Sequence, residues 1–244
     1  MWEENLGDFG QEIETDGVFH FECHPGLSCF GRCCRADISL TPYDIAKLRT
    51  YLKIDTTSFL SAHSATYTDP QTGFPSVILK RNDDGTCIFS QNGVCEVYES
   101  RPSCCRSYPL SQVIDEDGMT GRRWVRYRLQ QGADYCEGLG GGKEWTIKAY
   151  CDANDLERYE RANALFLDVA FEFYRLPHSV RHDKEVQQMV YSVVFNFDKF
   201  FDEYGKFPHT RLPEDDDEIM ELIRTIALGL IEKAAEPQQR AHSP

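Results

Sequence analysis

The chain has 244 residues, of which 41% are hydrophobic, so it is long enough to bury a sizeable core. Its 26 basic and 40 acidic residues give a net charge of −14, which argues against general nucleic-acid binding because such a surface repels phosphate. The acidic N-terminus lacks the basic and apolar regions of a signal peptide, and no apolar run reaches a membrane span. We therefore expect a soluble, cytoplasmic protein that binds neither nucleic acid nor membrane.

In chain order, we expect an irregular lead-in over residues 1–17 and then a short strand over Val18–Phe21. The loop that follows, Cys23–Cys34, contains proline and glycine at positions that allow tight bends. Thr41 is a natural N-cap, with Pro42 at the first helical position, and predicts a helix to about residue 53. A second short helix is expected over residues 57–63.

The middle of the chain predicts short strands and turns. Residues 73–80 and 86–90 have strand patterns, and a tight turn at 91–93 leads into a further strand over 94–98. This places Cys87 and Cys95 on the two arms of one hairpin, where neighbouring strands lie about 5 Å apart. One helical turn is expected over 102–107 and another hairpin over 110–130. The glycine-dense segment after Cys136 is interpreted as a sharp connection before a helix that starts at Thr146.

From about residue 153 the apolar residues repeat at helical spacing. Helices are expected over 153–176, 185–204 and 219–235, and a disordered tail over 237–244. The predicted fold class is therefore α+β. Its parts are a small cysteine-rich domain over residues 18–150 and a C-terminal helical bundle over residues 151–236.

Ten cysteines are the most informative feature of the sequence, and they include two adjacent pairs, Cys33–Cys34 and Cys104–Cys105. Adjacent cysteines rarely bond to each other, because a disulfide has tight geometric limits. Five disulfides would also require export to an oxidising compartment. Clustered thiolates are soft ligands that suit zinc and iron–sulfur clusters, so the pattern predicts a metal site with several thiolates.

The composite pattern resembles the YkgJ-like cysteine-cluster family, a zinc- or iron-chelating domain whose relatives include the flagellin lysine-N-methylases. The resemblance covers about residues 20–150. It rests on adjacent cysteines, Leu40-Thr41 with Asp44, Cys87-x-Phe89, the run from Cys95 to Pro109, and Cys136-x-Gly138. The cysteines that match the family are Cys23, Cys29, Cys33, Cys34, Cys87, Cys95, Cys105 and Cys136.

The resemblance implies that these eight cysteines are metal ligands, in two four-thiolate zinc sites or in one [4Fe–4S] cluster with thiolates left over. Five residues separate Cys23 from Cys29 where the family usually has two. Cys104 and Cys151 are additions to the pattern and are expected to be buried or incidental, and His24 is a spare ligand or a loop residue. Arg101 and Arg106 either offset thiolate charge or form salt bridges to Glu96 or Glu99.

Three functions follow as hypotheses. The first is a metal-binding protein that holds an iron–sulfur cluster or zinc and works in redox or protein-modification chemistry. The second is an S-adenosylmethionine-dependent protein lysine N-methylase, which rests on the family alone, because GLGGG lacks the spacing and ending of a phosphate loop. The third is a structural zinc module that recruits a protein. All three predict a protein partner or a protein substrate.

Overall fold

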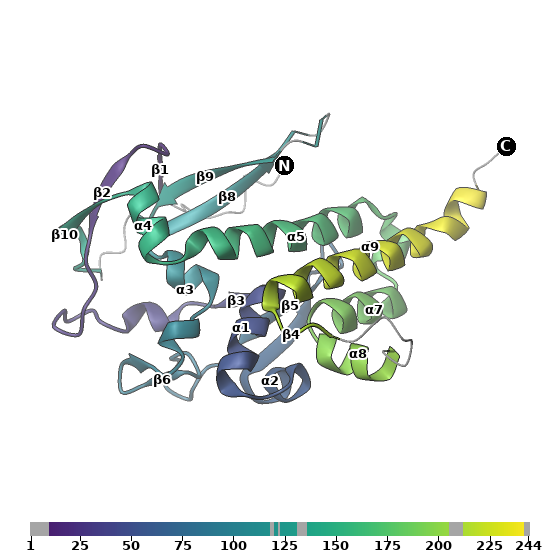
Figure 1. The fold of residues 1–244 in the computed structure, drawn as a ribbon, viewed down its shortest axis with the longest axis horizontal. Coiled ribbons are helices and arrows are strands. Elements are labelled where there is room, and N and C mark those ends of the chain that lie inside the picture. The colour runs from purple at the N-terminus through teal and green to yellow at the C-terminus, as the bar shows by residue number, and fades with distance from the viewer. Residues whose placement is uncertain (1–9, 118–119, 122, 131–135, 205–211, 242–244) are drawn as a thin grey trace. The chain divides into compact units, whose positions relative to one another are not determined.

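The structure is a computed structural model, and it describes residues 10–117, 120–121, 123–130, 136–204 and 212–241 (Figure 1). The chain forms two compact units that interleave in sequence. Unit 1 comprises Met1–Ala36, Ser90–Glu96 and Ser103–Glu157, and unit 2 comprises Asp37–Phe89, Val97–Pro102 and Arg158–Pro244. The domain boundaries expected from the sequence, near residues 17, 150 and 236, stay predictions.

In its described residues, unit 1 is built from short antiparallel sheets and three short helices. Strands β1 (Gln11–Ile13), β9 (Arg123–Leu129) and β8 (Leu110–Glu116) form one sheet in that order, and β2 (Val18–Phe21) pairs with β10 (Leu139–Thr146). Strands β6 (Ser90–Gln91) and β7 (Val94–Cys95) form a small hairpin. The helices are η1 (Arg32–Arg35), α3 (Ser103–Ser107) and α4 (Ile147–Ala153).

The core of unit 1 forms where β2, β8 and α4 meet. Phe19 and Phe21 alternate with exposed residues along β2, as a strand with one buried face requires. Their rings meet Tyr150 edge to face, at centroid distances of 5.3 and 6.2 Å. The hydroxyl of Tyr150 donates a hydrogen bond to the carbonyl of Tyr108, so the buried phenol is satisfied.

Two expectations for unit 1 were wrong. The lead-in is not wholly irregular, because Gln11–Ile13 pairs with Tyr127–Leu129 as strand β1. The glycine-dense segment is a strand, β10, rather than a sharp connection. Its register shifts between Leu139 and Glu144, so the glycines form an irregularity within the pairing with β2. The predicted strand Val18–Phe21 and the helical turn near residue 103 are confirmed.

Unit 2 opens with a three-stranded antiparallel sheet and two helices. Strand β5 (Pro75–Leu79) lies between β3 (Ser39–Leu40) and β4 (Ser64–Thr68). Helix α1 (Pro42–Leu52) begins with the predicted cap: the Thr41 hydroxyl accepts from the Asp44 amide, and the Asp44 carboxylate accepts from the Thr41 amide. Helix α2 (Thr56–His63) and the short helix η2 (Tyr98–Ser100) also belong to this unit.

The helices α5 (Leu156–Arg175), α6 (His178–Arg181), α7 (Lys184–Val194), α8 (Phe197–Tyr204) and α9 (Asp216–Ala241) follow one another. Helix α9 packs against α1 and α7, and α2 packs against α8. The single helix predicted over 185–204 is two helices, because the backbone breaks at Phe195–Asn196 and Phe195 and Phe197 turn into the core. Helix α9 continues to Ala241, past the point where the sequence predicted a disordered tail; residues 242–244 lie outside the described part of the chain.

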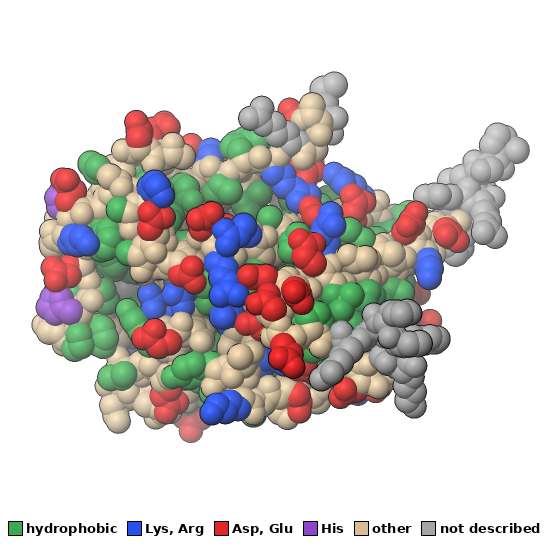
Figure 2. Space-filling view, in the orientation of Figure 1, with side chains coloured by type: hydrophobic (Ala, Val, Ile, Leu, Met, Phe, Trp, Pro, Cys, Tyr) green, Lys and Arg blue, Asp and Glu red, His purple; other side chains and the backbone are tan. Residues whose placement is uncertain are grey.

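Ion pairs join the helices of unit 2, and acidic and basic side chains lie close together over much of the face in Figure 2. Arg224 of α9 pairs with Asp168 of α5, and Arg158 pairs with Asp217, so these two helices run side by side in the same direction (Figure 1). Asp216 is buried and pairs with Lys47 at 3.2 Å. The acidic block at 214–218 is therefore partly a buried helix start.

The observed architecture confirms the predicted α+β class, with small antiparallel sheets and short helices first and packed helices last. Within the described residues, no helix is both long enough and apolar enough to cross a membrane.

Candidate metal centre

All ten cysteines lie among the described residues, and the structure gives each of them as a thiol outside any disulfide. Every cysteine except Cys87 falls in unit 1. The prediction that Cys87 and Cys95 sit on two arms of one hairpin was wrong. The carboxylate of Asp84 accepts from the amide and hydroxyl of Thr86, which keeps this segment in a turn, and Cys87 forms an isolated bridge with Arg81 in unit 2.

The adjacent pair Cys33–Cys34 lies on the one-turn helix η1, and the two side chains share a hydrogen bond. The bond from Cys33 is the main cause that holds the pKa of Cys34 below that of an ordinary thiol. The same bond, followed by burial and the nearby Cys23, raises the pKa of Cys33. Three sulfur side chains, those of Cys23, Cys33 and Cys34, are therefore close enough to influence each other's ionisation.

The β6–β7 hairpin adds Cys95 to this group. The Ser90 hydroxyl hydrogen-bonds Cys34, and Ser90 lies directly opposite Cys95 in the hairpin register. Directly opposed residues of antiparallel strands have Cβ atoms about 5 Å apart. Asn92 and Gly93 form the two-residue turn, both with positive φ (52° and 79°), as the Asn-Gly dipeptide predicts. We call Cys23, Cys33, Cys34 and Cys95 the Cys34 group.

A second pair of cysteines comes together at the other side of the same loop. The Sγ atom of Cys29, a side chain only 7% exposed, accepts a hydrogen bond of 3.3 Å from the backbone amide of Glu137. Glu137 directly follows Cys136, whose side chain is half-buried against the core of unit 1. Cys29 and Cys136 are 107 residues apart in sequence, and the fold brings the Cys29 side chain against the backbone of the residue that follows Cys136.

The remaining cysteines of unit 1 lie on α3 and α4. On α3 the two adjacent cysteines differ, since Cys104 is exposed and Cys105 is half-buried. Cys151 packs against the core, and its thiol lies 3.9 Å from the Tyr127 hydroxyl. Cys104 is exposed rather than buried, since a one-turn helix directs neighbouring side chains apart, and its expected incidental role stays a prediction.

Three positions that sequence reasoning singled out have local partners in the structure. His24 uses its Nδ1 atom to accept a hydrogen bond of 3.1 Å from the Gly26 amide, so this nitrogen serves the loop. Arg106 is buried, and its Nη1 donates to the Asn154 carbonyl at 3.1 Å. In unit 2, Arg101 donates to the Tyr98 carbonyl and lies 4.1 Å above the Tyr98 ring centroid.

The donor chemistry of unit 1 fits zinc or iron. Soft thiol ligands dominate, and the hydrogen bond from the Glu137 amide to Cys29 Sγ is of the kind that stabilises metal-bound sulfur. Among the described side chains, however, no three Cys, His, Asp or Glu residues form a ready-made coordination group. The cysteines are therefore neighbours with the right chemistry, and their side chains would have to turn inward to share one ion.

The segment that carries nine of the ten cysteines matches a protein-family model. Residues 22–137 match the family CxxCxxCC, described as "Putative zinc- or iron-chelating domain". The match confirms the resemblance to a zinc- or iron-chelating cysteine domain that was drawn from the sequence. The first cysteines depart from the spacing in the family's name, with five residues between Cys23 and Cys29 and three between Cys29 and Cys33.

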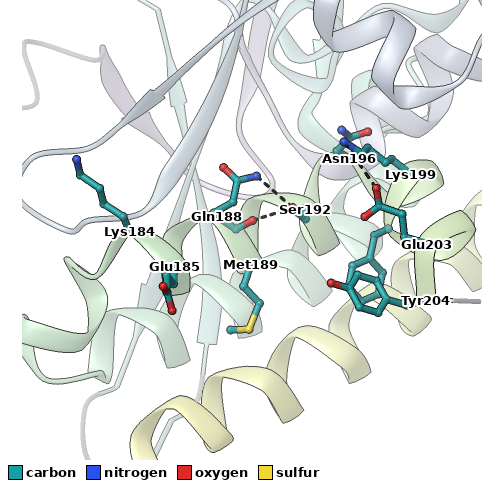
Figure 3. A pocket seen from close by; sticks show the side chains of 10 residues that line it. Lys184, Glu185, Gln188, Met189, Ser192, Asn196, Lys199, Glu203 and Tyr204 are labelled. Carbon is teal, nitrogen blue, oxygen red and sulfur yellow. Dashed lines mark hydrogen bonds and ion pairs between the residues drawn. The ribbon is translucent and has the colours of Figure 1, made fainter.

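Searches of curated proteins and of solved structures gave no match to the chain. A cavity of about 670 Å³ lies in unit 2, between side chains of α7 and α8 that include Lys184, Gln188 and Tyr204 (Figure 3). No cysteine is among the residues that line it. The candidate metal ligands therefore lie outside this cavity.

Sequence reasoning missed three residues that organise these loops: Ser28, Ser90 and Glu137. Ser90 had a usable signal, because a two-residue Asn-Gly turn pairs residue 90 with residue 95. Ser28 and Glu137 had none, since they are 109 residues apart and neither belongs to a cysteine spacing.

Proposed function

We propose that this protein is a metal-binding protein that holds zinc or an iron–sulfur cluster through the cysteines of unit 1. The observation that carries the proposal is the Cys34 group, in which Cys33 and Cys34 share a hydrogen bond and Cys23 lies near Cys33. Ser90 links Cys34 to the hairpin that carries Cys95. The match of residues 22–137 to a zinc- or iron-chelating family supports the same conclusion.

The proposed ligands are Cys23, Cys33, Cys34 and Cys95 for one centre, with Cys29, Cys105 and Cys136 as the further thiols of unit 1. Cys87 belongs to the pool through the family match alone. Bound zinc would supply folding stability and Lewis acidity, and a bound iron–sulfur cluster would supply electron transfer. The cysteines would hold the metal, and Ser90 would fix the position of Cys34 relative to Cys95.

The finer proposal is that the centre serves redox or protein-modification chemistry on a protein partner or a protein substrate. It rests on the family resemblance, as does the alternative of an S-adenosylmethionine-dependent lysine methylase. A thermal-shift measurement separates the two. Stabilisation by millimolar S-adenosylmethionine would favour the methylase, because a ligand that binds the folded state raises its melting temperature.

Elemental analysis of anaerobically purified protein, with a visible spectrum, tests the main proposal. Iron with sulfide and absorbance near about 400 nm would identify a cluster, and colourless protein with zinc would identify a zinc site. Protein that contains neither metal, and takes up neither Zn²⁺ nor iron with sulfide, would refute the proposal.

A further inference from the structure

Two cysteine-bearing loops of unit 1 are held together by one carboxylate. Both oxygens of the Glu137 side chain accept hydrogen bonds from Ser28: Oε2 from the Ser28 amide at 3.0 Å and Oε1 from the Ser28 hydroxyl. Ser28 directly precedes Cys29, and Glu137 directly follows Cys136. The contact therefore joins the residues next to two candidate ligands.

The backbone around Glu137 completes the junction. The amide of Glu137 donates to Cys29 Sγ at 3.3 Å, and the next residue, Gly138, accepts from the Glu22 amide through its carbonyl at 3.1 Å. The segment 136–138 is thus bonded to residues 22, 28 and 29 by three different groups. Arg32 contributes its positive charge to the environment of the same carboxylate.

We propose that Glu137 and Ser28 are positioning residues for the metal centre, which hold Cys29 and Cys136 in register with each other. We call the two residues the Ser28–Glu137 clamp. This inference rests on the proposed metal-binding function and adds to it a role for two residues outside the cysteine pattern. The clamp acts through Cys29 and is not itself a ligand.

Ser28 and Glu137, which join the two loops, are 109 residues apart in sequence. Bringing together two segments that are so distant in sequence costs conformational entropy, because the two loops would otherwise move independently. The side chains that bridge them must offset this cost. A carboxylate that accepts two hydrogen bonds fixes direction as well as distance. Because the amide of Glu137 is also the donor to Cys29, a shift of this residue moves the bonded sulfur. Residues that orient metal ligands in this way affect metal affinity by about 10- to 100-fold when they are replaced.

The alternative is that Ser28 and Glu137 form a surface contact that does not affect the metal centre. Glu137 and Ser28 are both exposed, and exposed polar contacts contribute little to global stability. The two views therefore differ in what they predict for Cys29. If the clamp positions Cys29, removal of the clamp makes Cys29 more accessible, while the rest of unit 1 keeps its stability. A simple surface contact changes neither.

The test uses the full chain, stripped of metal and kept reduced, in four forms: wild type, Glu137→Ala, Ser28→Ala and the control Glu144→Ala. Glu144 is an exposed carboxylate of the same unit, on β10, with a contact of 3.6 Å to His20. Two quantities are measured on each form. One is the rate at which iodoacetamide alkylates Cys29, resolved by mass spectrometry, and the other is the affinity for Zn²⁺ alone by competition with a chromophoric chelator.

We expect Glu137→Ala to raise the Cys29 alkylation rate several-fold and to weaken Zn²⁺ binding by about ten-fold, with an unchanged melting temperature. Ser28→Ala removes one of the two bonds and should produce a smaller change in the same direction. The control Glu144→Ala should match the wild type. If Glu137→Ala does not fold, Ser28→Ala and Glu137→Gln carry the test.

The outcomes separate the clamp from the function on which it rests. Wild-type Zn²⁺ binding with unchanged Cys29 alkylation in both clamp variants would overturn the clamp and leave the metal site standing. A wild type that binds no metal would overturn the proposed function and the positioning role with it. Faster alkylation of Cys29 in the control variant, to the same extent, would also overturn the clamp.

Discussion

Gly138 lies directly on the backbone of Glu22. Its carbonyl accepts the Glu22 amide, and a Cβ atom at this position would overlap the carbonyl oxygen of Glu22. The contact joins the end of β2 to the start of β10, immediately before the cysteine loop and immediately after Cys136. A side chain at residue 138 is therefore incompatible with the way in which this loop is closed.

Gly138→Ala should lower the free energy of unfolding of the chain by about 1–3 kcal/mol, because backbone atoms must move to make room for the methyl group. Urea unfolding followed by circular dichroism measures the change. Gly141→Ala is the matched control in the strand that follows, β10, since no atom lies within 4 Å of its Cβ position. Equal losses in the two variants would contradict the close approach at Gly138.

Cys34 and Cys95 are proposed to share one centre, since Ser90 bonds to Cys34 and lies opposite Cys95. Cys34→Ser and Cys95→Ser should each reduce the bound metal by one centre, and the double variant should lose no more than either single one. Because metal binding contributes to folding, both should also lower the melting temperature of the loaded protein. Metal content is measured by elemental analysis.

Cys104→Ser is the control for this pair, because Cys104 is exposed and lies outside the proposed ligands. We expect it to retain full metal content. Additive losses from Cys34→Ser and Cys95→Ser would place the two thiols in separate centres and contradict the Cys34 group.

Local signals predicted the fold well where a short segment decides its own structure. Thr41, Pro42 and Asp44 fix the start of α1, and Asn92-Gly93 fixes the β6–β7 turn, whatever the rest of the chain does. The glycines of β10 were misjudged because their strand exists only through pairing with β2, which lies more than a hundred residues earlier. Composition alone describes such a segment as a loop.

The sequence names the candidate thiols, whose role as ligands stays a prediction, but it does not show which of them lie near one another. The cysteines could be identified as candidate ligands because a thiol side chain has the chemistry that zinc and iron–sulfur clusters require. The assignment of Cys95 to the same group as Cys34 depends on Ser90, and the approach of Cys136 to Cys29 depends on Glu137. These are tertiary contacts, and a single sequence carries no record of them.

His63 should make unit 2 sensitive to mild acid. Its ring lies between Phe59 and Phe89, at centroid distances of 5.6 and 4.9 Å, and its buried Nδ1 has no hydrogen-bond partner among the described residues. Burial, with the charge of Lys80, lowers the pKa of His63 from 6.5. The unfolded chain therefore binds a proton more readily than the folded one.

Below about pH 6.5 the unfolded state binds more protons than the folded state, so protonation of His63 lowers the stability of unit 2 increasingly as the pH falls. Above that pH the imidazole is neutral in both states, and stability does not depend on its titration. His63→Phe keeps the ring contacts and removes the titration. Urea unfolding between about pH 7.5 and about pH 5.5 should show a smaller loss of stability for this variant than for the wild type. An identical pH dependence would exclude His63 as a source.

A half-buried carboxylate, that of Asp198, joins two helices of unit 2. Asp198 accepts from the Thr56 amide at 2.7 Å through Oδ2 and pairs with Arg49 at 3.2 Å through Oδ1. In return, the Thr56 hydroxyl accepts from the Asp198 amide at 3.1 Å. The start of α2 and the start of α8 thus satisfy each other's polar groups.

Asp198→Asn keeps the shape of the side chain but has one acceptor oxygen, so it cannot serve both Thr56 and Arg49. We expect a loss of about 1–3 kcal/mol in the free energy of unfolding, because a buried donor is left unsatisfied. Asp202→Asn, an exposed carboxylate on the same helix, should change stability by less than about 0.5 kcal/mol. Equal effects of the two substitutions in urea unfolding would show that the Thr56–Asp198 junction does not stabilise the packing of α2 on α8.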